Sequence, residues 1–211
     1  EGGIMNRNSK IYTVLFTFII SFVFILILSF FNGMTIQRTE KNKTLSTMKA
    51  ILNSMGIEYA DDDQAYALFS KSIKHEKKDS LDIYTFSGLS DTAIAVIFNG
   101  SGLWGSITGS VAFDKDISML LGVDFISQNE TPGLGGRIEE KWFKDQFKNR
   151  VVSEKPLELS KNKTGKGIYD SLSNEIDAVT GASLTSTYLL NIINSYIYKA
   201  KKVLGVSRYE H

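Results

Sequence analysis

Three short segments combine glycine, hydroxyl and apolar residues in patterns that ordinary packing does not require. They are 99–105 (NGSGLWG), 130–136 (ETPGLGG) and 177–186 (DAVTGASLTS). Glycine allows a backbone to approach a ligand closely, and a Leu-Trp pair offers a flat apolar surface. Small and hydroxyl residues at the start of a helix suit a phosphate. The three segments therefore contain residue types that could hold an apolar ring and a phosphate.

The first two segments also have a purely structural interpretation. Glycines around Trp104 are compatible with a hairpin turn, and 130–136 is compatible with a tight connection from a strand to a helix. Pro132-Gly133 favours a type II turn, because glycine accepts the positive φ, and Leu134 should project from this loop. Neither segment has the G-x-G-x-x-G or GK[ST] spacing of the common nucleotide-binding motifs.

The third segment lies where an extended stretch turns into the last long helix. A helix N-terminus carries partial positive charge and attracts anions. A Ser or Thr N-cap is the simpler explanation for a hydroxyl at this place. One cap does not require five hydroxyl residues, which here are Thr180, Ser183, Thr185, Ser186 and Thr187.

The amino-acid composition excludes several other kinds of functional site. The chain of 211 residues has no cysteine, so disulfides, a thiolate nucleophile and cysteine-held zinc or iron-sulfur clusters are excluded. With only two histidines, His75 and His211, no metal site is expected. From Asn32 to His211 there are 22 basic and 22 acidic residues. This balance argues against nucleic-acid binding, which usually needs a basic excess.

An uncharged apolar run, Ile11 to Phe31, precedes this balanced part. As a helix it would span roughly 30 Å, the thickness of a bilayer hydrocarbon core. A cleaved signal peptide has a shorter apolar core, of about 7–15 residues, and a small-residue cleavage site, which 30–34 does not offer. We therefore expect an uncleaved membrane anchor. Basic residues flank both ends, so the charge count does not set the orientation, but the short N-terminal side favours the bulk of the chain outside.

The elements that must position the three segments follow from periodicity. Helical spacing predicts helices over 40–56, 61–70, 139–149 and 183–203. Residues rich in Ile, Val, Phe and Thr predict strands over 82–86, 92–98, 106–113, 122–128 and 151–159, with 174–179 extended and 71–80 a charged loop. We expect an α+β fold with a mostly antiparallel sheet and flanking helices. The expected divisions are 1–10 as a short N-terminal segment, 11–31 as the transmembrane helix, 32–80 as a helical, membrane-proximal linker and 81–211 as the ligand-binding domain.

Taken together, the three segments resemble the covalent FMN-binding domain shared by two proteins. These are NqrC, from the sodium-translocating NADH:quinone oxidoreductase (Nqr), and RnfG, from the Rnf electron-transport complex. The family's flavinylation motif reads roughly D-x-x-[ST]-G-A-[ST]-x-T. It is matched here by Asp177, Thr180, Gly181, Ala182, Ser183 and Thr185. The patterns G-x-G-L-W and E-T-P-G-L-G-G also recur in the family, beside the isoalloxazine ring.

The resemblance implies that FMN is bound covalently by a phosphoester to Ser183. The family more often has Thr at this position, but Ser offers the same oxygen nucleophile; Thr185 is the second candidate. Asp177 would serve recognition by a separate flavin transferase that uses FAD and a divalent cation. The other cofactor-binding residues implied are Thr180, Gly181, Ala182, Leu184, Gly102, Leu103, Trp104, Glu130, Thr131, Pro132, Gly133, Leu134 and Gly135.

The function implied is that of an electron-transfer subunit without substrate chemistry of its own. It would be anchored in the bacterial inner membrane, with the FMN domain on the extracytoplasmic side, in an Nqr-type NADH:quinone reductase. Its partners would be the integral membrane and redox subunits of that complex. The RnfG protein of an Rnf-type ferredoxin:NAD⁺ oxidoreductase is the first alternative. A membrane-anchored sensor domain with a non-covalent anionic ligand and a structural protein without cofactor are the others.

Overall fold

The computed structural model describes residues 10–88, 92–152, 155–160 and 173–206. The chain divides into two compact units, one reaching to Thr44 and one beginning at Leu45.

Helix α1 runs from Lys10 to Ser54 as one continuous helix. Its apolar N-terminal part is exposed, and by length and composition it could cross a membrane. The helix expected over 40–56 is thus the continuation of the apolar segment. Gly56 follows the end of this helix, and its positive φ of 74° suits a residue without a side chain.

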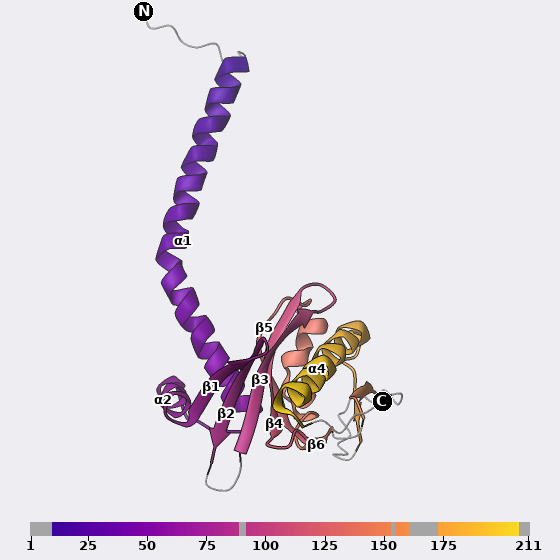
Figure 1. Cartoon of the computed structure of the whole chain (residues 1–211). Coiled ribbons are helices and arrows are strands. Elements are labelled where there is room, and N and C mark those ends of the chain that lie inside the picture. The colour runs from indigo at the N-terminus through magenta and orange to yellow at the C-terminus, as the bar shows by residue number, and fades with distance from the viewer. Residues whose placement is uncertain (1–9, 89–91, 153–154, 161–172, 207–211) are drawn as a thin grey trace, which may run out of the picture. The chain divides into compact units, whose positions relative to one another are not determined.

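Strands of the second unit form one antiparallel sheet in chain order (Figure 1). They are β1 (Ile73–Lys78), β2 (Leu81–Ser87), β3 (Thr92–Ser101), β4 (Ser106–Asp114), β5 (Met119–Gln128) and β6 (Arg150–Val151). A small parallel pair joins β7 (Glu158–Leu159) to β8 (Glu175–Ile176). The helices are α2 (Asp62–Ser72), the 3₁₀ helix η1 (Gly135–Glu139), α3 (Lys141–Asp145) and α4 (Ser183–Leu204). The expected α+β class with a mostly antiparallel sheet is confirmed.

Two sequence-based expectations are wrong in detail. The charged segment 71–80 is not a loop, because Ile73–Lys78 pairs with β2 as an edge strand and leaves its charged side chains exposed. The strand expected over 151–159 is split between β6 and β7, which belong to different sheets. The acidic residues 61–63 do begin a helix, since the Asp61 carboxylate caps α2 by accepting from the Gln64 N–H.

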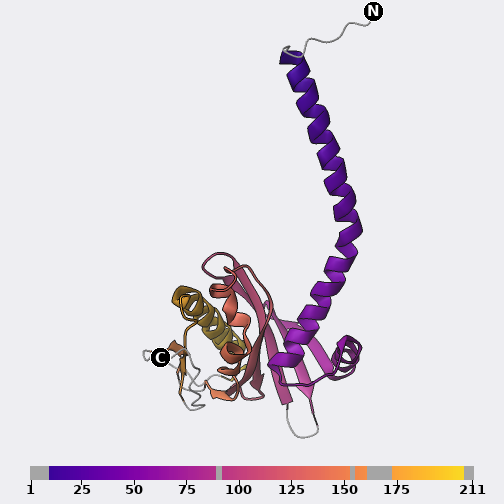
Figure 2. The same cartoon turned by 180° about the vertical axis from the view of Figure 1, so that it is seen from behind.

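Both faces of the sheet are buried, because successive side chains of a strand point to opposite faces and each face packs against other elements. On β3, Val96 and Phe98 point into a large core with α4, whereas Ala93 and Ala95 pack with Ile51 from the end of α1. Seen from behind, α2 and the last turns of α1 lie on the face opposite α4 (Figure 2). The compact unit therefore includes residues 45–80, which the sequence had suggested as a linker.

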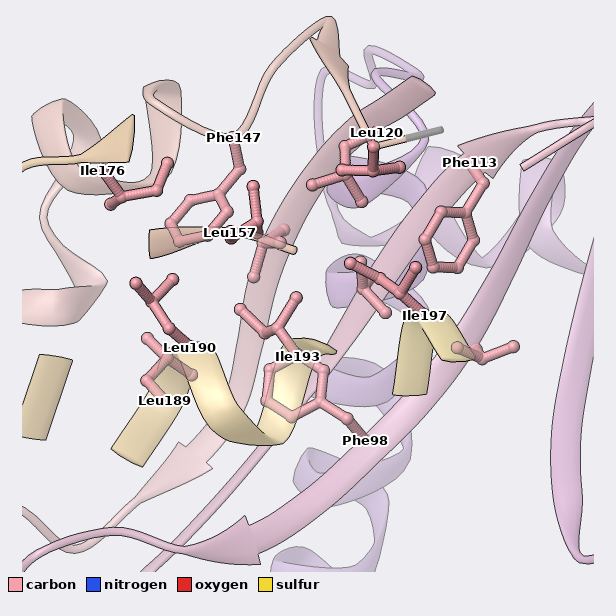
Figure 3. Packing of buried hydrophobic residues seen from close by; sticks show 14 of the residues in the cluster. Phe98, Phe113, Leu120, Phe147, Leu157, Ile176, Leu189, Leu190, Ile193 and Ile197 are labelled. Atoms are coloured by element: carbon pink, nitrogen blue, oxygen red, sulfur yellow. The ribbon is translucent and has the colours of Figure 1, made fainter. Parts of the chain in front are cut away.

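Helix α4 fixes one end of this core. Its side chains Leu190, Ile193 and Ile197 lie among Phe98 and Phe147 (Figure 3). The close packing of α4 on the sheet requires a glycine at position 100, because a Cβ there would lie 2.5 Å from Ile192 Cγ1. Glycine at this position therefore allows α4 to approach β3.

Sheet register brings the first two sequence motifs to one end of the sheet. Ser101 pairs with Ser106, so residues 102–105 form the β3–β4 turn. Ile107 in turn pairs with Gln128, the last residue of β5. The segment that follows β5 therefore leaves the sheet beside the β3–β4 turn.

Candidate functional site

A buried carboxylate, that of Glu130, lies where the three segments meet. Its exposed fraction is 4%. The Trp104 backbone N–H donates to Oε1 at 3.0 Å, and the Thr185 hydroxyl donates to Oε2 at 2.7 Å. Glycines admit the carboxylate on both sides, because a Cβ at Gly102 would overlap Oε1 and a Cβ at Gly135 would lie 2.7 Å from Oε2. One side chain thus connects the three predicted motifs.

The turn after Glu130 has the conformation expected from Pro132-Gly133. Gly133 has a φ of 75°, and the Leu134 N–H donates to the Thr131 carbonyl at 3.1 Å. The same carbonyl accepts from the Gly136 N–H at 3.0 Å. Residues 131–134 are exposed, so the loop presents its side chains outward.

A second glycine turn precedes α4. The Ala182 N–H donates to the Val179 carbonyl at 2.9 Å, and Gly181 has a φ of 80°. Ser186 braces this turn: its hydroxyl accepts from the Val179 N–H and donates to the Ala182 carbonyl, each at 3.1 Å. A Cβ at Gly181 would lie 3.3 Å from Leu134 Cδ2, so the two glycine turns are neighbours.

Ser183 is the first residue of α4 and is partly exposed. Within the described parts of the chain, its hydroxyl has no hydrogen-bond partner, and no side chain caps the helix, whose N-cap residue is Ala182. The simpler explanation of the hydroxyls as caps is therefore not supported. Thr185, the second candidate acceptor, is 1% exposed and already donates to Glu130. Ser183 and Thr185 thus differ in availability although they lie two residues apart.

Apolar side chains surround this end of the molecule without being buried. Exposed fractions are 75% for Trp104, 59% for Leu184, 46% for Leu134 and 40% for Leu103. Each extends from one of the segments that meet at Glu130. Exposed aliphatic and indole groups next to partner-free polar groups are suited to an amphipathic ligand.

Other predicted site residues occupy less prominent positions. Thr180 is exposed and Ala182 is buried. Asp177 is 7% exposed, and its backbone is held on both sides by one amide: the Asp177 N–H donates to Gln146 Oε1 at 2.8 Å, while Gln146 Nε2 donates to the Asp177 carbonyl at 3.2 Å. This places Asp177 within the fold, just before the turn that leads into α4.

Three residues that support the site were not singled out from the sequence. Gln146 holds the Asp177 backbone, Ser186 braces the turn before α4, and the Gln128 side-chain oxygen accepts from the Glu130 N–H at 2.6 Å. Ser186 lies inside the motif and could have been recognised as a hydroxyl with a backbone role. Gln146 carries no local signal, because its partner Asp177 comes from another part of the chain, whereas Gln128 bonds to a residue only two positions further along.

Hydrogen bonds set the electrostatics of Glu130. Burial alone would raise its pKa, but the N–H of Trp104, the Thr185 hydroxyl and backbone hydrogen bonds from Gly105 and Leu103 outweigh burial, so the pKa lies below its ordinary value of 4.5. Donors that favour the charged form lower a carboxyl pKa in this way. The site therefore holds a carboxylate at neutral pH.

This lowered pKa predicts a dependence of stability on pH. A group whose folded-state pKa is depressed stabilises the fold above its unfolded pKa and loses that contribution as pH falls through the folded value. We expect the urea midpoint to fall below about pH 4.5, and to fall less steeply in Glu130→Gln. Glu140 and Asp145 also have lowered pKa values and remain in both proteins, so the difference between the two curves reports Glu130. Parallel curves would contradict the prediction.

Residues 102–198 match the FMN-binding domain family. Among curated proteins, the chain is similar to the C subunit of the Na⁺-translocating NADH-quinone reductase of Neisseria meningitidis serogroup A, at 34% identity over 93 residues, 44% of this chain and 36% of that protein. The corresponding protein of Pasteurella multocida is 34% identical over 100 residues, 47% of this chain and 38% of that protein. The matched segment thus spans little more than a third of the length of these relatives.

Solved structures agree on the fold. The crystal structure of NqrC from Shewanella oneidensis superposes with a TM-score of 0.66 at 17% identity, covering 80% of this chain and 100% of that one. Its counterpart from the Na⁺-translocating reductase of Parabacteroides distasonis gives a TM-score of 0.64 at 19% identity, covering 84% of this chain and 98% of that one. These structures support the fold, and the match of residues 102–198 agrees with the resemblance predicted from the three motifs.

Proposed function

We propose that the chain, whose residues 102–198 match the FMN-binding domain family, holds FMN covalently through the Ser183 hydroxyl. The observation that supports Ser183 is its availability: a partly exposed hydroxyl at the start of a 22-residue helix, without a partner among the described residues. Thr185 is buried and donates to Glu130, which disfavours it as the acceptor.

Residues at the site fit both the phosphate and the isoalloxazine ring of FMN. The first N–H groups of α4 and the helix dipole favour an anion next to Ser183. The exposed side chains of Leu103, Trp104 and Leu134 offer an apolar surface for the isoalloxazine ring. Gly133 and Gly181 form tight turns that keep Cβ atoms away from this surface. When bound, FMN would supply the electron-transfer chemistry, while the chain binds, orients and partly shields it.

Attachment would use FAD as the flavin donor. The Ser183 oxygen forms the new bond to the phosphorus of the FMN half, the pyrophosphate bond breaks, and AMP leaves while the hydroxyl proton passes to a base of a separate flavin transferase. This step conserves the oxidation state of the flavin. We propose that Asp177 and the turn before α4 form part of the segment that such a transferase recognises.

We further propose that the apolar part of α1 anchors the chain in the bacterial inner membrane, with the FMN domain on the extracytoplasmic side. The chain would then act as an electron-transfer subunit of an Nqr-type complex, next to integral membrane and redox subunits. The named relatives belong to such a reductase, which favours this assignment over the RnfG protein of an Rnf complex. A fixed anchor would keep the flavin at a short distance from its partners.

Covalent FMN gives a direct test of the proposal. When the full chain is co-expressed with a flavin transferase, we expect a fluorescent band on a denaturing gel under ultraviolet light. Intact mass should increase by one FMN less one water. A dark band and an unchanged mass would contradict the proposal and favour a non-covalent anionic ligand or a scaffold without cofactor. Peptide mapping should place the added mass on Ser183.

A further inference from the structure

Glu130 is placed among the cofactor-binding residues by sequence resemblance, but its oxygens are already occupied. Oε1 accepts from the Trp104 N–H and Oε2 from the Thr185 hydroxyl. The N–H groups of Leu103 and Gly105 also help to lower the pKa of this carboxyl. With the residue only 4% exposed, both carboxylate oxygens are bonded within the chain itself.

The two donors come from two separate parts of the site. Trp104 belongs to the β3–β4 turn, 26 residues before Glu130. Thr185 belongs to the first turn of α4, 55 residues after it. Ser183 lies in that same helical turn. The Glu130 carboxylate therefore connects the turn that carries the apolar surface to the turn that carries the acceptor hydroxyl.

We infer that Glu130 is a positioning residue for flavin attachment: its carboxylate holds the β3–β4 turn and the first turn of α4 together, so that Trp104 and the Ser183 hydroxyl face one ligand. This inference rests on the proposed function for its link to flavin. Glu130 itself touches neither the flavin nor the reacting atoms. Its effect is transmitted through Trp104 on one side and Thr185 on the other.

Substitutions at Thr185 separate this role from simple loss of packing. Thr185→Val keeps the shape of the side chain but removes the donor to Glu130, while Thr185→Ser keeps the donor and loses only a methyl group. Loss of a hydrogen bond to a charged group should shift the local opening equilibrium roughly tenfold. We therefore expect the Trp104 amide to exchange its hydrogen roughly tenfold faster in Thr185→Val. The acceptor of that amide, Glu130, is unchanged in this variant.

Asp114 provides the matched control. Its carboxylate clamps the β4–β5 turn by accepting from the N–H groups of Ser118 and Met119, at 2.8 and 3.1 Å. It lies at the opposite end of β4 from the site, roughly 25 Å away along nine residues of strand. Asp114→Asn weakens a carboxylate clamp of the same kind without touching the site. Urea unfolding identifies the conditions under which all variants are folded.

The experiment measures two quantities on the full chain: exchange of the Trp104 amide, and the initial rate of covalent flavin attachment from FAD by a flavin transferase. We expect Glu130→Gln and Thr185→Val to slow attachment, and Thr185→Ser and Asp114→Asn to attach flavin at close to the wild-type rate. The inference is overturned if the wild type accepts flavin and Thr185→Val changes neither the rate of flavin attachment nor the exchange of the Trp104 amide. Equal slowing in Asp114→Asn would also overturn it, since general stability would then explain the effect. If the wild type itself accepts no flavin, the proposed function fails, and exchange at Trp104 still decides whether Glu130 couples the two turns.

Discussion

Ser183→Ala should abolish covalent flavin completely, leaving no fluorescent band and the unmodified mass. Ser183 provides a partly exposed hydroxyl at the start of α4, without a partner among the described residues, and alanine removes its oxygen while retaining a helix-compatible residue. Thr185 cannot take over without giving up its hydrogen bond to Glu130 and moving from a position that is 1% exposed. The measurement is in-gel fluorescence together with intact mass after co-expression with the transferase.

Two variants control this result. Ser183→Thr retains a hydroxyl at the same position and should keep attachment. Thr187→Ala removes an exposed hydroxyl one turn further along α4, which donates to the Ser183 carbonyl, and should also stay fluorescent. Residual attachment in Ser183→Ala, mapped to Thr185, would move the linkage to that residue. Loss of the whole complex instead of its flavin would favour a scaffold role.

Gly102→Ala should be among the most destabilising single-methyl changes in the second unit. The added Cβ would overlap Glu130 Oε1 and would lie 2.8 Å from Ile107 Cδ1. The carboxylate cannot simply move, because Trp104 and Thr185 hold it. Overpacking together with weakened hydrogen bonds should lower the free energy of unfolding by about 3 kcal/mol. Thermal unfolding should then occur roughly 6–12 °C lower.

Gly133→Ala is the matched comparison for that change. Gly133 belongs to the neighbouring loop and has a φ of 75°, but a Cβ there meets nothing within 4 Å. Only conformational strain should result, about 1 kcal/mol. Urea unfolding of both variants at neutral pH measures the difference. If Gly102→Ala were no more destabilising than Gly133→Ala, the Glu130 carboxylate would be less tightly held than the structure indicates.

Much of the fold could be predicted because its signals are local. The Ile, Val, Phe and Thr content of β3 and β4, the spacing of apolar residues in α4 and the glycine that follows α1 are all local features of the sequence. The edge strand β1 was missed for the opposite reason. Its charged sequence has low strand propensity, and pairing with β2 decided its conformation.

The candidate site likewise combines features that local sequence predicts with features that only tertiary packing decides. Motif spacing identified Ser183, the Pro132-Gly133 turn and the exposed Trp104, because each depends on a residue type or a turn of four residues. The order of these motifs also led to the FMN-binding family, whose model matches residues 102–198. The membrane anchor was predicted from an apolar run of sufficient length, and its place in a bilayer stays a prediction.

By itself, then, the sequence determined which residues could carry a phosphate-linked ring and which family they resemble. Only the tertiary structure decided which hydroxyl is available and what Glu130 does. The pairing of β3, β4 and β5 and the packing of α4 on β3 bring Trp104 and Thr185 to one carboxylate across 26 and 55 residues of sequence. Such hydrogen bonds depend on register and packing throughout the domain. For this reason no local pattern distinguishes the buried, bonded Thr185 from the partly exposed Ser183 two residues before it.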